Sequence, residues 1–220
     1  MKIYVECEES QTVCKSFRLL GFEAYSRDIK DCSGGKPEWH IKGNSLDYIN
    51  DYSDIRICHP VCKFLANSGV KNLVRNGRRI NPERWDKLEE AIMFFNSFKK
   101  ANSKMIAIEN PIPHCYARDG FKNRYGRWVE GIGGYTQIVQ PWQFGHKEMK
   151  ATCLWLMNLP KLKPTNVVGP PPKDVEERKQ WAKVHRMPPG PDRERLRSKT
   201  YKGIANAMSD QWGSLITIKR

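Results

Sequence analysis

Residues 2–28 read KIYVECEESQTVCKSFRLLGFEAYSRD, and the hydrophobic period changes twice along them. The first residues have the composition of a buried strand, after which Val13, Phe17 and Leu20 fall on one face of a helix. Gly21 is suited to end that helix, and a second short strand follows. A strand, a helix and a strand of this length predict a parallel crossover unit, and therefore a single doubly wound α/β sheet.

Two more strands and one long helix extend this pattern. Residues 54–57 and 105–108 are short runs rich in branched apolar residues, as in buried strands. Asn81 and Pro82 form a typical helix start, with a capping side chain followed by proline in the first turn. The apolar face of the predicted helix packs in the core and has no functional role; it consists of Trp85, Leu88, Ile92, Phe95 and Phe98.

Cys62 and Glu109 come shortly after these two strands, within HPVC at 59–62 and IENP at 108–111. Ligand sites in open α/β sheets lie at the carboxyl ends of strands. A thiolate and a carboxyl group are what alkylation of cytosine at C5 requires, because the thiolate adds to C6 while the carboxyl group holds N3. His59 or Lys63 is a candidate positive neighbour for the thiolate. The alternative is that Cys62, like many free cysteines, is simply a core residue.

The composition restricts the class of protein. A chain of 220 residues can form one large domain, and it contains no apolar run long enough to cross a membrane. Because the first residues run directly into a strand rather than a signal peptide, we expect a cytoplasmic protein. Seven scattered cysteines predict reduced thiols. No metal is expected, although a zinc site built from the Cys58–Cys62 region and His114-Cys115 is an alternative.

Positive charge is concentrated in the later part of the chain. The net charge is +14, yet residues 1–60 carry 8 Lys/Arg against 10 Asp/Glu, which leaves +16 for residues 61–220. This asymmetry favours a nucleic-acid partner over a small-molecule one. Basic residues alternate with aromatic residues in a predicted surface loop at 118–135. A second basic segment, residues 178–202, contains nine Lys/Arg. The candidate nucleic-acid contacts are Arg118, Lys122, Arg124, Arg127, Trp128 and Arg186. A merely solvated basic surface is the alternative.

The last quarter of the chain has a different composition. Residues 164–172 are rich in proline and predict an extended connector, followed by a charged helical segment at 174–184 and a closing helix at 204–212. We therefore expect a catalytic domain at 1–160, with a connector and a basic helical segment at 161–220 packing on it.

The chain resembles the cytosine C5 DNA methyltransferases, and most closely their small, mostly phage-encoded relatives. The resemblance runs along the whole chain and is carried by residues 5–10 (VECEES), 59–62 (HPVC) with 67–69 (NSG), 108–111 (IENP), 140–146 (QPWQFGH), 150–156 (KATCLWL) and 185–189 (HRMPP). It implies a Rossmann-like fold that binds S-adenosylmethionine, with DNA as the partner and with the host cytoplasm as the location if the chain is phage-encoded.

The resemblance also implies roles for individual residues. Cys62 is the nucleophile and Glu109 the acid that polarises the pyrimidine, while Glu8, Glu9 and Ser10 approach the methionine part of the cofactor. Asp28 holds the ribose hydroxyls, and Asn44 and Pro60 complete the cofactor site. The loop after the first strand lacks the family's glycines, so we expect the cofactor to be approached there by a different backbone path or a tighter side-chain contact. The chain has no room for the family's separate recognition domain, so we expect low sequence specificity.

Three functions remain open on the sequence. The first is transfer of a methyl or related group to C5 of cytosine in DNA. The second is an enzyme of the same fold that acts on free pyrimidine nucleotides. The third is a catalytically silent DNA-binding relative. Retention of both Cys62 and Glu109 favours an enzyme, whereas the altered glycine loop favours the silent binder.

Overall fold

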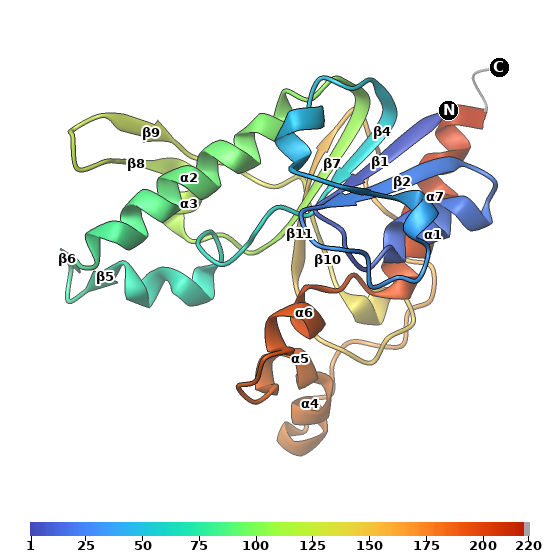
Figure 1. Cartoon of the computed structure of the whole chain (residues 1–220). Coiled ribbons are helices and arrows are strands. Elements are labelled where there is room, and N and C mark those ends of the chain that lie inside the picture. Colours follow the sequence, from blue (N-terminus) through green and yellow to red (C-terminus); the bar gives the residue numbers. More distant parts are fainter. Residues whose placement is uncertain (218–220) are drawn as a thin grey trace.

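The computed structural model describes residues 1–217, which fold around one seven-stranded sheet (Figure 1). The strand order is β10-β11-β7-β4-β1-β2-β3. All neighbouring pairs from β7 to β3 are parallel, whereas β11 runs antiparallel to both of its neighbours. The strands are β1 (Lys2–Glu6), β2 (Glu23–Asp28), β3 (His40–Lys42), β4 (Ser53–Cys58), β7 (Ser103–Pro111), β10 (Gln137–Val139) and β11 (Thr152–Met157).

Helices cover both faces of this sheet, as the sequence predicts. Helices α1 (Thr12–Leu19) and α7 (Lys202–Thr217) share one hydrophobic cluster with the apolar residues of β1 and β4, such as Val5 and Ile57. Helix α2 (Pro82–Lys99) packs through Leu88 and Phe95 in a second cluster that contains Ile106 and Ile108 of β7. Figure 1 shows α1 and α7 side by side. The mixed α/β architecture is therefore confirmed.

The local signals for the helix ends are also confirmed. Gly21 follows α1 with a φ of 81°, the left-handed conformation that glycine adopts without strain. Asn81 caps α2, since its side chain accepts a hydrogen bond from the amide of Arg84. The five predicted core residues of α2 are all buried.

The chain order creates a switch point in the sheet. From β1 the chain moves outward to β2 and β3, then returns to place β4 on the other side of β1. Connections that leave in opposite directions open a crevice at the carboxyl ends of the two central strands. This edge carries both the loop after β1 and the Cys62 loop after β4.

Two groups of short elements project beyond the sheet (Figure 1). One group contains the 3-10 helix η3 (Asn67–Asn72), β5 (Val74–Arg75), β6 (Arg78–Arg79), α3 (Cys115–Asp119), β8 (Gly120–Lys122) and β9 (Trp128–Glu130). The other contains α4 (Val175–Trp181), α5 (Lys183–Arg186) and α6 (Arg193–Ser198). Three further 3-10 helices lie along the chain, namely η1 (Pro37–Trp39), η2 (Ser45–Tyr48) and η4 (Pro141–Gln143).

The prediction of a loop over residues 118–135 is wrong. The segment begins at the end of α3 and forms the antiparallel β8–β9 hairpin, in which Phe121 pairs with Val129. Both side chains are buried in the same cluster as Trp85 of α2. The alternation of basic and aromatic residues is therefore in part the period of a half-buried strand pair.

The closing helix is part of the main core. Ile204, Met208 and Trp212 of α7 are buried in the cluster that contains Val5, and Trp212 donates from Nε1 to the carbonyl of Pro160 at 3.0 Å. The predicted connector at 164–172 contains no helix or strand and forms a single bridge, between Asn166 and Phe144. Among residues 1–217, no helix combines the length and the apolar character that a bilayer crossing requires.

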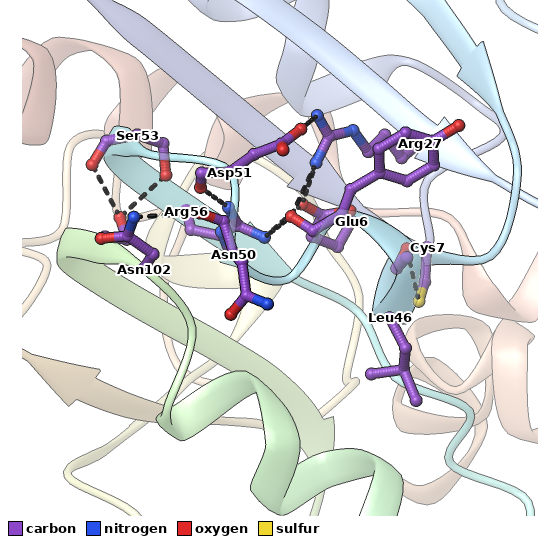
Figure 2. Close-up of polar contacts among 12 residues, drawn as sticks. Glu6, Cys7, Arg27, Leu46, Asn50, Asp51, Ser53, Arg56 and Asn102 are labelled. Carbon is purple, nitrogen blue, oxygen red and sulfur yellow. Dashed lines mark hydrogen bonds and ion pairs between the residues drawn. The ribbon is translucent and has the colours of Figure 1, made fainter.

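A buried charged cluster occupies the sheet face opposite α1 (Figure 2). Glu6 accepts from Arg56 at 3.0 Å and from Arg27 at 3.3 Å, and all three side chains are almost fully buried. Arg27 also pairs with Asp51 at 2.7 Å and lies 3.7 Å from the centre of the Tyr4 ring. Burial raises the pKa of Glu6, and the charges of Arg56 and Arg27 oppose that shift. Ion pairs and ring contacts therefore replace an apolar layer between these strands and η2.

Candidate functional site

The two predicted catalytic residues lie on segments that are joined to each other. Strand β7 continues through Pro111, so Glu109 is inside this strand, next to β4 and its Cys62 loop. Asn110 donates from Nδ2 to the carbonyl of Pro60 at 2.9 Å, and the amide of Asn67 donates to Ile112 at 2.8 Å. The backbone that carries Cys62 is therefore fixed against the strand that carries Glu109.

His59 is the direct partner of Glu109. Its Nδ1 lies 2.8 Å from Oε2 of Glu109, and both side chains are nearly buried, with exposed fractions of 11% and 12%. Burial alone would raise the pKa of Glu109, but the hydrogen bond and charge of His59 lower it. Burial alone would lower the pKa of His59, whereas the hydrogen bond and charge of Glu109, together with the charge of Glu8, raise it. The pair is therefore ionic, with Glu109 charged.

The thiol of Cys62 is partly buried. Burial, followed by the negative charge of Glu109, raises the pKa of Cys62, and Lys150 and Arg197 partly oppose this shift. The predicted positive neighbours were His59 and Lys63. Instead, His59 is engaged by Glu109, and Nζ of Lys63 lies 5.8 Å from the centre of the Phe64 ring. The cations that favour the thiolate come from the later chain.

The later chain also forms one wall of the site. A small cavity beside Glu109 is lined by Lys150, Thr152, Thr200, Tyr201 and Ile204. Lys150 donates from Nζ to the carbonyl of Lys199 at 3.1 Å, which ties this wall to the segment before α7. The cavity therefore joins Glu109 to the basic part of the chain.

A larger depression lies at the other end of the strands. It has a volume of about 540 Å³ and is lined by Met1, Lys2, Tyr4, Asp51, Tyr52 and Asp54. None of the predicted site residues lines it. Because Glu109 lies near the carboxyl end of β7 and Cys62 lies beyond the carboxyl end of β4, chemistry that uses them takes place away from this depression.

The loop after β1 adopts glycine-like backbone angles without glycine. Cys7 and Gln11 each have a φ of 57°. The buried side chain of Gln11 makes two hydrogen bonds with the backbone of Lys36, accepting at 3.1 Å and donating at 2.7 Å. Two residues with side chains thus adopt left-handed backbone angles in this loop, and hydrogen bonds to Lys36 fix the side chain of one of them.

Glu8 occupies the N-terminus of α1. Its carboxylate accepts from the amide of Val13 at 2.6 Å and from the amide of Cys14 at 3.2 Å. Burial raises the pKa of Glu8, and the charge of His59 together with these two amides opposes the shift. The neighbouring predicted residues, Glu9 and Ser10, are half-buried, and Oγ of Ser10 lies 3.1 Å from Oγ1 of Thr12.

The remaining predicted cofactor residues lie along the same edge. Asp28 ends β2, is half-buried, and accepts the amide of Lys30 through Oδ1 at 2.9 Å. Asn44 is exposed, and its Oδ1 accepts the amide of Leu46 at 3.1 Å, so it caps η2. Pro60 is buried and contributes only the carbonyl that Asn110 holds.

The predicted nucleic-acid residues lie on the two projecting groups, and all six are exposed. Arg118 pairs with Asp119 at 2.7 Å, and Arg124 pairs with Asp86 at 3.2 Å. Trp128 is 58% exposed, although its indole donates to Glu130 at 3.1 Å. The set is completed by Lys122 and Arg127 in the β8–β9 region and by Arg186 at the end of α5.

The thiols and possible metal ligands need only a brief account. All seven cysteines are free. Among the side chains that the structure describes, which exclude that of Glu194, no three of His, Cys, Asp or Glu are arranged so that they could hold a metal ion.

Sequence reasoning missed three residues of this site. From the sequence, His59 is a candidate neighbour of Cys62 and part of the alternative zinc region, while Lys150 and Asn110 belong only to segments that carry the resemblance. The sequence does contain a signal for two of them, because His59 lies three positions before Cys62 and Asn110 directly follows Glu109. The pairing between them depends on the register of β4 against β7, which the sequence does not display.

Comparisons with known proteins give a distant structural likeness and no match in sequence. No protein-family model matches the chain, and no curated protein matches it. One similar solved structure is described as a candidate DNA modification methyltransferase encoded within a prophage, from E. coli. The likeness has a TM-score of 0.43 and 10% sequence identity, covers 76% of this chain, and spans about half (51%) of that one. The assignment of a function therefore depends on the geometry of the site.

Proposed function

We propose that this protein is an S-adenosylmethionine-dependent transferase that places a methyl group on C5 of cytosine in DNA, with low sequence specificity. The observation that carries the proposal is the joining of the Cys62 loop to the β7 strand of Glu109 at the carboxyl edge of the sheet, through the His59–Glu109 and Asn110–Pro60 contacts. These contacts support the proposal, because addition to a pyrimidine requires a thiol and a carboxyl group on neighbouring segments.

The N-terminus of α1 supports this choice of cofactor over a dinucleotide. In dinucleotide-binding folds, the free amides at this helix end bind a pyrophosphate. Here the carboxylate of Glu8 accepts two of these amides, and its own charge would repel a phosphate. S-adenosylmethionine has no phosphate and carries positive charge on its sulfonium and ammonium groups, so the residues fit it better. Glu8, Glu9, Ser10, Asp28, Asn44 and Pro60 are the residues that we propose to hold it.

The proposed reaction assigns one task to each catalytic residue. The thiol of Cys62 loses its proton to water, and its sulfur forms a bond to C6 of the base while the electron pair of the C5–C6 double bond shifts toward N3. Glu109 holds a proton at N3 and draws electron density there, and His59, which donates to Glu109, is a source for that proton. The cofactor supplies an electrophilic methyl group. That methyl group would be transferred to C5. Loss of the C5 proton to water would then release the sulfur of Cys62 from C6.

The resting state of the site bears on when the thiolate forms. Since burial and the charge of Glu109 raise the pKa of Cys62, the thiol is protonated at neutral pH in the free protein. When a base fills the site and Glu109 takes up the proton that it shares with N3, the main opposing charge is removed. Thiolate formation is therefore coupled to occupancy of the site by a pyrimidine.

A covalent trap tests this proposal. With S-adenosylmethionine present and its binding established by calorimetry, DNA that contains 5-fluorocytosine should give a stable protein–DNA adduct, because fluorine at C5 cannot leave as a proton does. Cys62→Ser should abolish the adduct while DNA and cofactor binding change less than about 3-fold, since the change removes the nucleophile and little volume. Cys115→Ser, at an exposed thiol outside the site, is the matched control. Absence of any adduct on single- or double-stranded DNA would contradict the proposal.

The raised pKa of Cys62 favours a second candidate, a DNA-binding relative without catalysis. Such a protein would bind DNA with the same salt dependence but would form no adduct. It would also react with iodoacetamide at Cys62 at the same rate with and without cytosine-containing DNA. In the proposed methyltransferase, Cys62 should react with iodoacetamide faster when DNA fills the site. If the bound base shields the thiol from iodoacetamide, the 5-fluorocytosine adduct distinguishes the two candidates instead.

A further inference from the structure

The β5–β6 ribbon, Val74–Arg75 paired with Arg78–Arg79, has no role in the site described above. Arg75 pairs with Arg78 across a two-residue turn, in which Asn76 has a φ of 49° and Gly77 a φ of 72°. Two consecutive residues with positive φ form the turn that matches the natural twist of a hairpin. The ribbon is therefore a regular two-stranded hairpin with arginines at its tip.

This ribbon lies in a stretch of chain without acidic residues. No Asp or Glu occurs between Asp54 and Glu83, whereas Arg56, Lys63, Lys71, Arg75, Arg78 and Arg79 all fall there. Arg75 and Arg78 are exposed, and within residues 1–217 neither side chain has an ion pair or hydrogen bond. Their positive charges are left for a partner outside the chain.

The base of the ribbon is held firmly. The carbonyl of buried Leu73 accepts from Nε1 of Trp85 at 3.2 Å and from the amide of Ile80 at 2.8 Å. Arg79 lies 4.2 Å from the centre of the Trp85 ring and donates to the carbonyl of Lys122 at 2.6 Å. This last contact joins the ribbon to the β8–β9 hairpin. The ribbon therefore projects as a fixed element.

The ribbon is also connected to the candidate nucleophile. Residues 63–72 lead from the Cys62 loop to the ribbon, and Arg84 at the start of α2 donates from Nη2 to the carbonyl of Lys63 at 3.2 Å. In Figure 1 the ribbon lies at the same end of α2 as the β8–β9 hairpin, so both project from one side of the sheet. A duplex that contacts the ribbon would thus lie beside the Cys62 edge.

We propose that the β5–β6 ribbon enters a groove of duplex DNA next to the target base, with Arg75 and Arg78 contacting phosphates or base edges. The inference rests on the proposed function in taking DNA as the substrate. The major groove, about 12 Å wide, admits a two-stranded ribbon, and the guanidinium fork suits phosphate and guanine. A single strand is the poorer partner, because the ribbon has no aromatic side chain on which a base could stack.

The test compares Arg75→Ala/Arg78→Ala with the wild-type chain. Fluorescence anisotropy measures binding to a fluorescein-labelled 30-base-pair duplex and to one of its strands, from 50 to 250 mM NaCl without cofactor. Loss of two groove contacts should lower duplex affinity by about 10-fold or more and reduce the salt slope by about 2. Single-strand affinity should fall by less than about 3-fold. The melting temperature should stay within about 2 °C, because neither side chain has a partner in the folded chain.

Two further variants separate groove contacts from general charge. Lys161→Ala/Lys163→Ala removes the same charge from exposed positions beside Gln211 of α7 and should lower duplex affinity by less than about 3-fold. Arg75→Lys/Arg78→Lys should keep the salt slope but weaken duplex binding, since lysine lacks the fork. Equal losses in the ribbon and control variants, equal losses on duplex and single strand, or no duplex binding by the wild-type chain would each overturn the proposal.

These measurements are independent of catalysis. A chain that binds duplex through the ribbon but forms no adduct with 5-fluorocytosine would contradict methyl transfer and leave the ribbon proposal intact. A chain that forms the adduct equally well with and without Arg75 and Arg78, and binds duplex equally well, would contradict the ribbon proposal alone.

Discussion

The imidazole of His59 is influenced by two carboxylates, Glu109 in contact and Glu8 nearby through its charge. The contact with Glu109 uses Nδ1, whereas the buried Nε2 has no hydrogen-bond partner among residues 1–217. A buried imidazolium that is held by one carboxylate fixes the orientation of that carboxylate. His59 is therefore a positioning residue for Glu109 in the proposed reaction.

The contribution of the His59–Glu109 pair to stability should depend on pH. The pKa of His59 is raised from 6.5 and that of Glu109 lowered from 4.5, so the pair stabilises the fold fully between these two values. The contribution is lost as pH rises through the raised pKa of His59, and as pH falls through the lowered pKa of Glu109. His59→Gln should therefore cost about 2–4 kcal/mol near pH 6 and at least about 1 kcal/mol less near pH 9.

Urea denaturation of both proteins at the two pH values measures this difference. His185→Gln, at an exposed position, is the control and should show no pH-dependent gap. If the loss in free energy of unfolding caused by His59→Gln is the same at both pH values, the His59–Glu109 pair is not ionic.

Much of the candidate site at this scale could be predicted. Cys62 and Glu109 are candidates from the sequence because each follows a predicted apolar strand, and strand ends converge in a parallel sheet; the structure extends β7 past Glu109. Lys150 and Arg197 could not be identified as the cations near Cys62, because that proximity arises where the later chain folds back over the site. Positions so far apart in the chain are related only by tertiary packing.

The loop between β1 and α1 adopts left-handed backbone angles although it contains no glycine. Gln11 is buried with a φ of 57°, and its amide group is fixed by Lys36. The sequence shows the absence of glycine, and from it we expected a different backbone path or a tighter side-chain contact. Left-handed backbone angles in a residue with a side chain cannot be predicted from composition, since the compensating contact comes from residues 25 positions later.

A pair of substitutions tests this strain. Gln11→Ala and Gln11→Gly both remove the two hydrogen bonds to Lys36, but only glycine also removes the steric cost of the positive φ. Gln11→Gly should therefore be more stable than Gln11→Ala by about 1 kcal/mol in urea denaturation. At Lys87, an exposed position inside α2, the order should reverse, with glycine less stable than alanine by about 1 kcal/mol. The same order at both positions would contradict the strained path.

At the scale of the whole molecule, α7 is seated against η4 at Gly203. A Cβ at this position would lie 1.8 Å from the carbonyl oxygen of Phe144, and the amide of Gly203 donates to Nε2 of His146 at 3.0 Å. No side chain fits there without movement of the backbone. The end of α7 near the site is therefore fixed by a close approach of two main chains.

Substitution of this glycine should disturb the whole fold. Alanine favours a helix by about 1 kcal/mol over glycine, yet the clash with Phe144 should make Gly203→Ala less stable than wild type by about 1–3 kcal/mol. Gly134→Ala is the control, because a Cβ at that position would have no neighbouring atom within 4 Å, and it should change stability by less than about 0.5 kcal/mol. Chemical denaturation measures both. An unchanged or more stable Gly203→Ala protein would contradict this seating of α7.

The architecture of the sheet followed from the sequence because local periodicity and the crossover rule act together over residues 2–28. The reversed direction of β11 did not follow, since parallel and antiparallel strands have similar composition when both faces are buried. The β8–β9 hairpin was missed for a related reason. Its strands are only three residues long, and the surrounding glycines and basic residues hide the alternation of buried and exposed residues.

Because α1 packs on α7, the first helix is synthesised long before its packing partner. Oγ of Ser16 donates to Oδ1 of Asn206 at 3.0 Å, although the two residues are 190 positions apart in the chain. At translation rates of about 5–20 residues per second, α1 leaves the ribosome roughly 10–40 seconds before its partner helix exists. During that interval Val13 and Phe17, both fully buried in the finished protein, lack the apolar residues of α7 that share their cluster. The newborn chain is therefore most exposed to aggregation and to chaperone binding at its first helix.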